Sequence, residues 1–466
     1  MGPTPSSSND RSERRKRNAK TTIQSLEPDT LCMIFALLDF FDLVRCSAVC
    51  KYWNTIINKS KLLREFYAKQ KQNSTEFSNK STCSETSLKT YLEELAMEHH
   101  RVSLQEGLIN IDQWKGHSVG FNQCRMKMGL ILTGKGDKVM RLWSLESYKC
   151  VEEYAVPDTV PLVDFDFDES KIVGLVGTRI CIWRRNGKRS IFPSNEGTFV
   201  KGLCMRGNQR FQCHEILVGG VALQNGGLKE RRGKCYCATL SYNDPEAVVG
   251  CEDGTARLFD MYSRKCSRII RMRAGPVTCL CLSDDQLILS GSSLGSITVS
   301  GILSDQQVAT LRSRITIGGI KTLCYNACSH LVFAGSTSGY TSCWDLRTMR
   351  SLWETRVSPN VVYSVQHLRS DKSTLVVGGI DGVLRTLDQN TGQVLASCVM
   401  EGNALSSSQN TYGATEKRKG RRLSEGTPID SIPKSARPPI TCLAVGMKKV
   451  VTAHNGRHIR LWKFNS

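Results

Sequence analysis

One short pattern recurs along most of this chain, and this repetition constrains the fold more than any other feature. Each copy has an apolar residue followed closely by glycine, then a turn carrying aspartate or glycine, then alternating apolar residues, with some variation between copies. The copies span residues 132–143, 173–183, 249–260, 289–300, 334–345, 377–388 and 451–462. Apolar side chains at every second position predict strands with one buried face. We therefore expect a mainly β protein built from repeated small sheets.

The spacing of the copies indicates the kind of repeat. Outside two long gaps, successive copies lie about 40 to 45 residues apart, which is the period of a propeller blade made of four antiparallel strands. The chain from about residue 105 onwards therefore predicts a β-propeller with seven blades. Six blades are the alternative, because the second and fourth copies are weak.

The last copy predicts how the ring closes. The chain ends soon after Trp462, which leaves the final blade one strand short. Residues 107–114 precede the first copy and alternate in part as a strand does. We expect this segment to supply the missing outer strand, so that the ring has no open edge.

The first copy carries the most specific residues. Over roughly residues 105 to 466 the chain resembles the WD-repeat family, whose blades contain a buried network of His, Ser or Thr, Asp and Trp. The matching positions are His117, which follows Gly116, and Thr133, Asp137 and Trp143. The resemblance implies that these four side chains are structural and satisfy polar groups inside a blade. His117 is then not a catalyst.

A second pattern, ahead of the repeats, has helical spacing. Four large apolar residues lie at positions i, i+3, i+4 and i+7, which places them on one face of a helix; they are Leu31, Ile34, Phe35 and Leu38. Pro28 and Asp29 suit the start of that helix. Two more short helical segments follow, near Asp42 and after Cys50. None is long enough to be stable alone, so the three must pack on each other or on a partner.

This helical segment resembles an F-box. The resemblance rests on the ordered series Leu26-Glu27-Pro28-Asp29-Thr30-Leu31, Ile34-Phe35, Leu37-Leu38 and Val49-Cys50-Lys51-Tyr52-Trp53-Asn54, in which Glu27 interrupts the usual Leu-Pro pair. It implies binding to a Skp-type adaptor, which bridges to a cullin scaffold. The implied adaptor-binding residues are Leu26, Pro28, Leu31, Ile34, Phe35 and Leu38. The alternative is a helical cap that packs on the neighbouring domain.

These patterns predict four parts of the chain. Residues 1–20 form a disordered basic arm, 21–68 the F-box, 69–104 a linker with a helix, and 105–466 the propeller, with insertions near 187–235 and 401–440. The linker helix carries Leu88, Leu92 and Leu95 on one face, so it either packs on the propeller or acts as a rigid spacer. The second insertion is rich in Ser, Thr, Gly and Pro and is expected to be disordered.

The formal net charge of +20 has three competing interpretations. Basic clusters at residues 14–17 and 417–422 fit nuclear import signals. The overall charge fits contact with nucleic acid, although aromatic residues do not alternate with the clusters as a single-strand platform requires. A solvated surface, including residues 264–273, needs no function at all.

Composition argues against several other classes. No run of 18 or more apolar residues and no secretory leader is present, so we expect an intracellular protein of the nucleus, the cytoplasm or both, without membrane contact. The 20 cysteines are scattered and include no Cys-x-x-Cys pair, so they are interpreted as small buried strand residues. Neither a metal nor another cofactor is expected.

Catalysis finds little support in the motifs. There is no His-Glu-x-x-His sequence and no Cys/His pairing with a recognisable local signature. Asp164, Asp166 and Asp168 alternate with phenylalanines, and we expect them to form one exposed face of a strand.

The two resemblances together predict a non-catalytic substrate-recognition subunit of an SCF-type E3 ubiquitin ligase. The F-box would bind the Skp-type adaptor, and the propeller would bind a target protein. Basic residues near the turns would favour an acidic or phosphorylated target through charge-assisted hydrogen bonds; these are Lys135, Lys138, Arg179, Arg257, Arg385 and Arg460. The rival hypothesis is a WD-repeat scaffold of a nuclear or RNA-associated complex.

Overall fold

The computed structural model divides the chain into two compact units, residues 1–86 and 87–466. The residues that it describes are 23, 26–38, 40–60, 62, 88–134, 138–156, 161–185, 202–206, 209–217, 237–303, 307–315, 317–401, 415–424 and 426–465. The basic arm expected at residues 1–20, and the site candidates Lys135 and Asp137, lie outside them.

Three short helices make up the described part of the first unit: α1 (Pro28–Phe35), α2 (Phe40–Val49) and α3 (Lys51–Lys59). Pro28 occupies the first turn of α1, where no backbone donor is lost. The Cys50 sulfur accepts a hydrogen bond from the backbone N–H of Trp53 and so caps α3. The rings of Phe35 and Trp53 pack edge to face with centroids 5.3 Å apart. Each helix is therefore stabilised by packing on the others, as its shortness requires.

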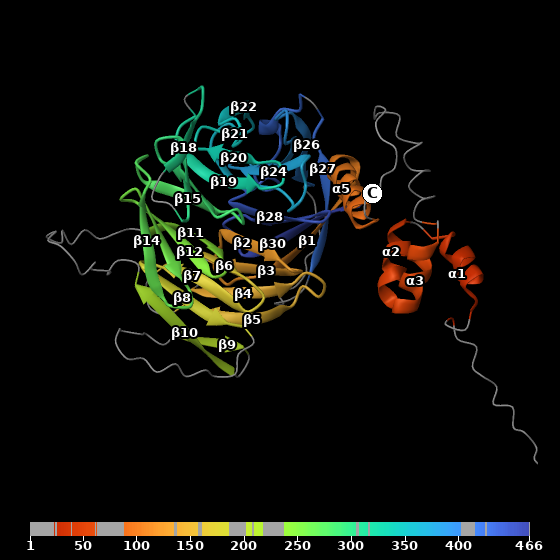
Figure 1. The fold of residues 1–466 in the computed structure, drawn as a ribbon. Helices are drawn as coiled ribbons and strands as arrows, with labels where there is room; N and C mark the ends of the chain where they lie inside the picture. The colour runs from red at the N-terminus through yellow and green to blue at the C-terminus, as the bar shows by residue number, and fades with distance from the viewer. Residues whose placement is uncertain are drawn as a thin grey trace, which may run out of the picture. The chain divides into compact units, whose positions relative to one another are not determined.

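The second unit is a ring of small antiparallel sheets, seen in Figure 1. In the described chain, seven inner strands each contact the next, and the last contacts the first. They are β2 (Gln123–Lys127), β6 (Leu162–Phe167), β11 (Cys237–Asn243), β15 (Val277–Leu282), β19 (Ile320–Asn326), β23 (Val362–Gln366) and β28 (Cys442–Gly446). This closed cycle establishes the β-propeller and its seven blades.

The middle strands of the blades carry the repeated sequence pattern. The second strands are β3 (Leu130–Gly134), β7 (Lys171–Val176), β12 (Glu246–Cys251), β16 (Leu287–Ser292), β20 (Leu331–Ser336), β24 (Thr374–Gly379) and β29 (Lys449–Ala453). The third strands are β4 (Val139–Ser144), β8 (Arg179–Arg184), β13 (Thr255–Asp260), β17 (Ser296–Gly301), β21 (Tyr340–Asp345), β25 (Leu384–Asp388) and β30 (His458–Asn465). Five turns between them use a glycine with positive φ, at Gly177, Gly254, Gly295, Gly339 and Gly382. Side chains are disfavoured in that conformation.

The outer strands complete the blades. They are β5 (Cys150–Ala155), β10 (Gln209–Leu217), β14 (Lys265–Arg271), β18 (Gln307–Arg312), β22 (Arg350–Arg356), β26 (Val394–Met400) and β1 (Leu108–Lys115). The second blade has a fifth strand, β9 (Gly202–Arg206), which pairs with β10. Both strands lie in the insertion near 187–235, so part of that insertion extends a blade.

The ring closes as the sequence predicts. Strand β1 pairs antiparallel with β30, with Ile111 opposite Trp462. In Figure 1 the orange strand β1 lies beside the blue strand β30, so segments from the two ends of this unit meet in one blade. Ile111 and Trp462 are both buried in an apolar cluster that also contains Phe464.

The cores lie between neighbouring blades. Between the first and second blades, for example, Leu132 and Leu142 pack against Phe165 and Trp183. Apolar residues on alternate strand positions of one blade thus meet those of the next, and the cluster is removed from water on both sides. Each blade is consequently stabilised by its neighbours.

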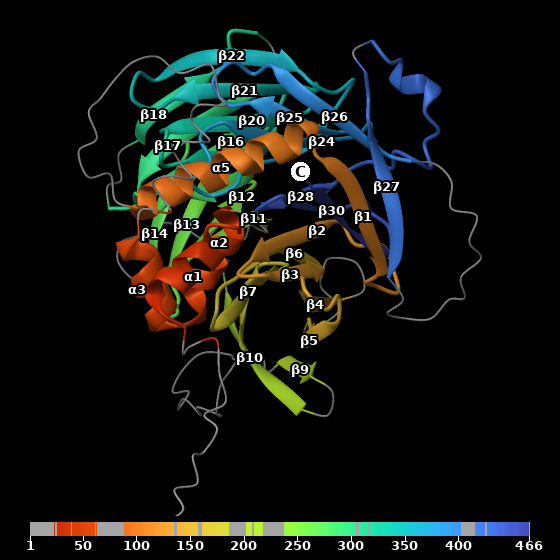
Figure 2. The same ribbon diagram turned by 90° about the vertical axis from the view of Figure 1, so that its right-hand side faces the viewer.

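The expectation that the insertion at 401–440 is disordered is wrong for residues 415–424 and 426–440. The basic run forms strand β27 (Glu416–Arg422), and a short 3-10 helix, η2 (Ile429–Ser431), follows it. β27 inserts between β26 and β1 and joins two blades into one nine-stranded sheet. Figure 2 shows β1 and β27 side by side. Alternate side chains of β27 are half-buried, so within this basic run Lys417, Lys419 and Arg421 are the exposed residues.

Arg422, the last residue of β27, holds the end of the linker helix. That helix, α5 (Leu88–Glu106), belongs to the propeller's unit and packs on it with the buried residues His100, Ser103 and Leu104. The Arg422 guanidinium donates to the carbonyl oxygens of Leu104 (2.9 Å) and Gly107 (2.6 Å), and also to those of Ser103 and Gln105. A cation in this position satisfies carbonyl groups that have no partner inside the helix and opposes the helix dipole.

Arg422→Ala is expected to lower the free energy of unfolding by about 2 kcal/mol, the upper range for a partly buried cation at a helix C-terminus. Urea denaturation measures the change, and amide exchange across α5 locates it. Arg421→Ala, at an exposed neighbouring position, is the matched control and should change stability by less than about 0.5 kcal/mol. Equal effects of the two variants would contradict the capping role.

Candidate functional site

The helical unit leaves large apolar side chains in solvent. Met33 is 67% exposed, Ile34 38% and Leu37 87%, and Val49 and Tyr52 are also exposed. Such side chains usually lie inside a domain, and a group of them on so small a unit marks a protein-binding surface. The five residues Met33, Ile34, Leu37, Val49 and Tyr52 are called the exposed apolar set below.

The six residues implied to bind an adaptor do not share one environment. Leu31 and Phe35 are fully buried in the core of the unit. Leu26 and Leu38 are half-buried, and Pro28 and Ile34 are exposed. Leu31 and Phe35 can therefore only pack beneath the residues of a binding surface, inside the helical unit. Pro28 and Ile34 can contact a partner directly. Sequence reasoning did not single out Met33 and Leu37 as binding residues, although both flank the predicted apolar face.

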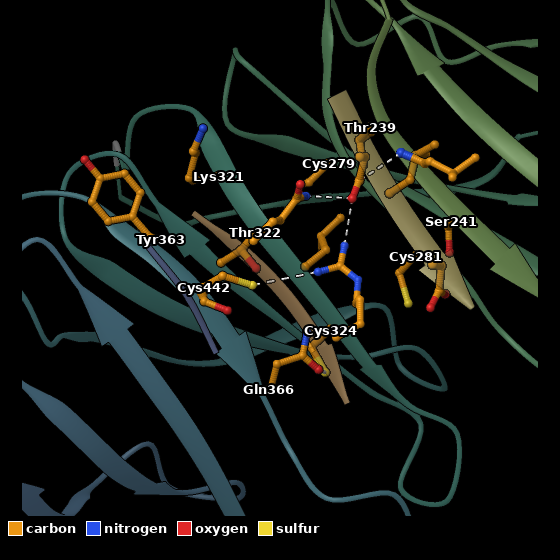
Figure 3. A pocket seen from close by; sticks show the side chains of 18 of the residues that line it. Thr239, Ser241, Cys279, Cys281, Lys321, Thr322, Cys324, Tyr363, Gln366 and Cys442 are labelled. Carbon is orange, nitrogen blue, oxygen red and sulfur yellow. Dashed lines mark hydrogen bonds and ion pairs between the residues drawn. The ribbon is translucent and has the colours of Figure 1, made fainter. Parts of the chain in front are cut away.

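The propeller surrounds a cavity of about 640 Å³ that is lined by its inner strands. Figure 3 shows side chains around it, among them Thr239, Lys321, Tyr363 and Cys442, which come from four different blades. The charged residues in the lining are Arg125, Asp164, Asp166, Lys321 and Arg369. The sequence did not predict the cations among them, Arg125, Lys321 and Arg369, as site residues. Their positions in the sequence could have indicated them, because each cation lies on or just after the strand that precedes an apolar-x-Gly segment.

The alternation with phenylalanine predicted that Asp164 lies on an exposed strand face. The structure places it elsewhere. It is buried and accepts hydrogen bonds from Gln123 Nε2 (2.6 Å) and Arg125 (3.0 Å) of the first blade. It also accepts from Thr239 Oγ1 (3.1 Å) and the Leu240 N–H (3.0 Å) of the third blade. A buried carboxylate needs such partners. Asp164 therefore connects three blades.

The other two aspartates of this strand also bond to neighbouring blades. Asp166 forms an ion pair with Lys127 (2.7 Å), and Asp168 accepts from the Tyr242 hydroxyl (2.6 Å). Hydrogen bonds from Tyr242 and from the turn at Ser170 lower the pKa of Asp168, against an opposing effect of burial. The expectation of an exposed acidic face is wrong, because the inner strand of a propeller has blades on both sides.

The five described substrate-binding candidates lie on five different blades. Lys138 is exposed in a turn, Arg179 begins β8, and Arg257 is paired with Asp253 (3.1 Å). Arg460 donates to Gln113 Oε1 (2.7 Å), and burial lowers its pKa to about 10. The structure places none of them in the lining of the central cavity. The remaining candidate, Arg385, lies in a different cavity.

That second cavity, of about 780 Å³, lies between the fifth and sixth blades and the segment around η2. Four basic residues line it, Arg356, Arg385, Lys434 and Arg437, with two acidic residues, Asp381 and Asp430. At its base Arg385 forms a buried ion pair with Asp381 (2.6 Å). The buried Ser358 hydroxyl, also in the lining, has no hydrogen-bond partner among the described residues. The excess of positive charge favours an anionic ligand.

The histidine of the first repeat lies in a structural network. Thr133 Oγ1 accepts from Trp143 Nε1 (2.9 Å) and lies 2.8 Å from His117 Nε2. Arg141 lies 2.9 Å from His117 Nδ1 and can only donate. Nδ1 is then the acceptor, and Nε2–H donates to Thr133. His117 lines neither the central nor the second cavity, which agrees with a structural role.

The last blade repeats this arrangement with a histidine that the sequence comparison of the repeats did not single out. Thr452 Oγ1 accepts from Trp462 Nε1 (2.9 Å) and lies 2.7 Å from His454 Nε2. His454 Nδ1 lies 3.1 Å from the carbonyl oxygen of Pro438, so this nitrogen carries the proton. The two blades share the hydrogen bond from Trp to Thr, but the His–Thr bond runs the other way, because neutral His454 accepts from the Thr452 hydroxyl at Nε2.

Residues 291–295 are Gly-Ser-Ser-Leu-Gly, which matches the Gly-x-Ser-x-Gly motif of a hydrolase nucleophile elbow. The elbow requires a turn from a strand into a helix. These residues instead form the hairpin turn between β16 and β17, and the segment is therefore not an elbow. Among the described residues no group of three or more His, Cys, Asp or Glu side chains could hold a metal ion. No described helix is long and apolar enough to cross a membrane.

The fold defines a class of protein in which a small helical unit precedes a WD-type propeller. A model of the F-box-like domain matches residues 24–69. The chain is 51% identical over 487 aligned positions to an F-box/WD-40 repeat-containing protein of Arabidopsis thaliana, and the alignment covers all of both chains. It is 24% identical over 298 positions to the human angio-associated migratory cell protein, covering 57% of this chain and 66% of that protein.

The chain therefore belongs to the F-box/WD-40 repeat-containing proteins. Members of this family are generally non-enzymatic adaptors. The combination of an F-box with WD repeats suggests an adaptor that recognises a substrate.

The His454 network predicts a pH dependence of stability. Burial, together with the charge of Arg460, lowers the pKa of His454 to about 3. The ordinary pKa of histidine is about 6.5, so the unfolded chain binds this proton more readily than the folded chain. Stability is then complete above about pH 6.5 and falls as the pH drops towards 3, by no more than about 1.4 kcal/mol per pH unit.

Urea denaturation at several pH values tests this dependence. His454→Gln is expected to flatten the decline below about pH 6.5, whereas His330→Gln, at an exposed turn, should leave it unchanged. An unaltered slope in His454→Gln would show that another group is responsible.

Proposed function

We propose that this chain is the non-catalytic substrate-recognition subunit of an SCF-type E3 ubiquitin ligase. Its F-box-like unit binds a Skp-type adaptor, which connects it to a cullin scaffold, and its propeller binds the target protein. The chain itself supplies proximity and orientation between the target and the ubiquitin-transferring partners.

The observation that carries this proposal is the exposed apolar set on the helical unit. Met33, Ile34 and Leu37 follow one another along α1 and the turn after it, and Val49 and Tyr52 lie at the junction of α2 and α3. Placing such side chains in a partner's groove is a common mode of helix recognition, in which a few large residues dominate the binding energy.

We propose that the target binds in the second cavity of the propeller. Arg356 and Lys434 stand exposed at its rim, and Arg385 and Ser358 lie at its base. With four basic and two acidic residues the lining carries a net charge of +2. Guanidinium and hydroxyl groups together suit a carboxylate or phosphate, so we propose an acidic or phosphorylated segment of the target as the ligand. Arg385 is the one sequence-predicted residue that contributes.

The double variant Ile34→Asp, Leu37→Asp is expected to abolish recovery of a Skp-type adaptor with the full chain, because it places two charges in an apolar interface. Co-purification followed by mass spectrometry measures it. Both residues are exposed, so the helical unit should stay folded, which circular dichroism checks.

Asn58→Asp is the matched control, since it adds a charge at an exposed position of α3 outside the exposed apolar set. It should retain the adaptor. Recovery of no adaptor with the unmodified chain would reject the ligase proposal and favour the scaffold of a nuclear or RNA-associated complex. Salt-sensitive binding of RNA would then be the expected property.

Reversing the charges at the cavity rim, in Arg356→Glu, Lys434→Glu, is expected to weaken binding of phosphorylated peptides at least about tenfold. A phosphopeptide array compared with its unphosphorylated counterpart supplies the ligands, and fluorescence anisotropy measures the affinity. Lys138→Glu, an exposed turn position not in the lining, is the control. Unchanged affinity in the rim variant would remove this cavity from the proposal.

A further inference from the structure

The central cavity of the propeller is lined by several thiols. Cys279, Cys281, Cys324 and Cys442 all contribute to the lining, and Figure 3 shows them around the pocket. None of the described cysteines is in a disulfide. Cys279 and Cys442 are equally inaccessible, at 8% and 7% exposure. Their surroundings differ, however, and the difference concerns the charge on sulfur.

Cys442 lies next to a permanent cation. Arg125 Nη1 donates to Cys442 Sγ at 3.8 Å, and the same guanidinium is held by Asp164 at 3.0 Å. A guanidinium stays charged at any physiological pH and favours the thiolate form of a neighbouring cysteine. Figure 3 shows the contact with Cys442 as a dashed line. Cys279, by contrast, contacts only the Thr278 hydroxyl among the side-chain partners described for it.

A second thiol adjoins Cys442. Cys124 is fully buried on β2, and its side chain hydrogen-bonds with that of Cys442 on β28. In its protonated form Cys442 Sγ donates a hydrogen bond to the Cys124 carbonyl oxygen at 3.3 Å. The two strands belong to the first and last blades and pack against each other. The thiol pair therefore spans the interface at which the ring closes.

The hydrogen bond with Cys124 lowers the pKa of Cys442, and Arg125 lowers it further, while burial and Asp164 act in the opposite direction. The same hydrogen bond and burial raise the pKa of Cys124. Because Arg125 Nη1 contacts the sulfur of Cys442 at 3.8 Å, Cys442 is assigned as the nucleophile and Cys124 as the remaining thiol. In Cys279, burial raises the pKa to about 12.

We propose that Cys442 is a site of oxidation by peroxides and that Cys124 is its resolving cysteine. A reactive thiolate beside a second thiol, reached through a cavity, is the arrangement that peroxide-sensitive cysteines use. This site is separate from the exposed apolar set and from the second cavity, so it does not depend on the ligase proposal.

The chemistry proceeds in two balanced steps. The Cys442 thiolate attacks one oxygen of hydrogen peroxide, the O–O bond breaks, hydroxide leaves, and Cys442 becomes a sulfenic acid. The Cys124 thiol then attacks the Cys442 sulfur, the S–O bond breaks, and water leaves with the thiol proton. Sulfur loses two electrons in total and peroxide gains them. Two equivalents of a small thiol restore the reduced pair by exchange. The disulfide would join the first blade to the last.

The first test compares two cysteines of one cavity in the full-length chain. Iodoacetamide labelling at pH 7, followed by peptide mass spectrometry, is expected to modify Cys442 at least about tenfold faster than Cys279, because only a thiolate reacts. Equal or slower reaction of Cys442 would overturn the proposal, since the two side chains are matched in exposure.

The second test follows the product. Limiting hydrogen peroxide should yield a linked peptide pair containing Cys124 and Cys442 and a species of faster mobility on non-reducing gels, both reversed by dithiothreitol. In Cys124→Ser the disulfide should be absent, and a dimedone-type probe should instead trap sulfenic acid on Cys442. Cys279→Ser should behave as the unmodified chain. Oxidation without a Cys124–Cys442 link in the unmodified chain would reject the pair.

Discussion

Every other feature of the larger unit depends on the pairing of β1 with β30. A propeller blade buries apolar side chains only against its neighbours, so an open ring would expose two interfaces at once. Here the closing blade takes three strands from the C-terminal part of the chain and one from the N-terminal side of the propeller. The closure of the ring is non-covalent: it depends on the hydrogen bonds between β1 and β30 and on the buried side chains of Ile111 and Trp462. The central cavity, the thiol pair and the second cavity all have their shape only in the closed ring.

The sequence predicted this architecture well because period and alternation are local signals that repeat. It predicted β1 from a missing strand, and the pairing of Ile111 with Trp462 confirms it. It did not predict β27, because Lys417 to Arg422 lacks apolar residues and its composition suggests a solvated loop. The strand forms because its backbone has partners on both sides and because Arg422 has four carbonyl oxygens to satisfy.

The candidate sites were harder to predict, for a related reason. Helical spacing showed that residues of α1 share a face, yet a three-helix unit buries Leu31 and Phe35 and leaves Ile34 and Leu37 in water. Which apolar face is the core depends on α2 and α3, not on α1 alone. The same holds for Asp164, whose partners come from positions 123, 125, 239 and 240. Contacts between distant segments leave no trace in a local pattern.

The junction of α5 and β1 has a consequence for the order of events during synthesis. A single residue, Gly107, separates the helix from the closing strand, and the partner strand β30 is the last described strand that the ribosome makes. Until then β1 has no β30 to pair with, and until Arg422 is made α5 also lacks its cap. Strand β1 is therefore among the first strands to be made and among the last to complete its pairing. A chain that stalls within the last blade would carry the F-box-like unit together with a ring that lacks its closing strand pair.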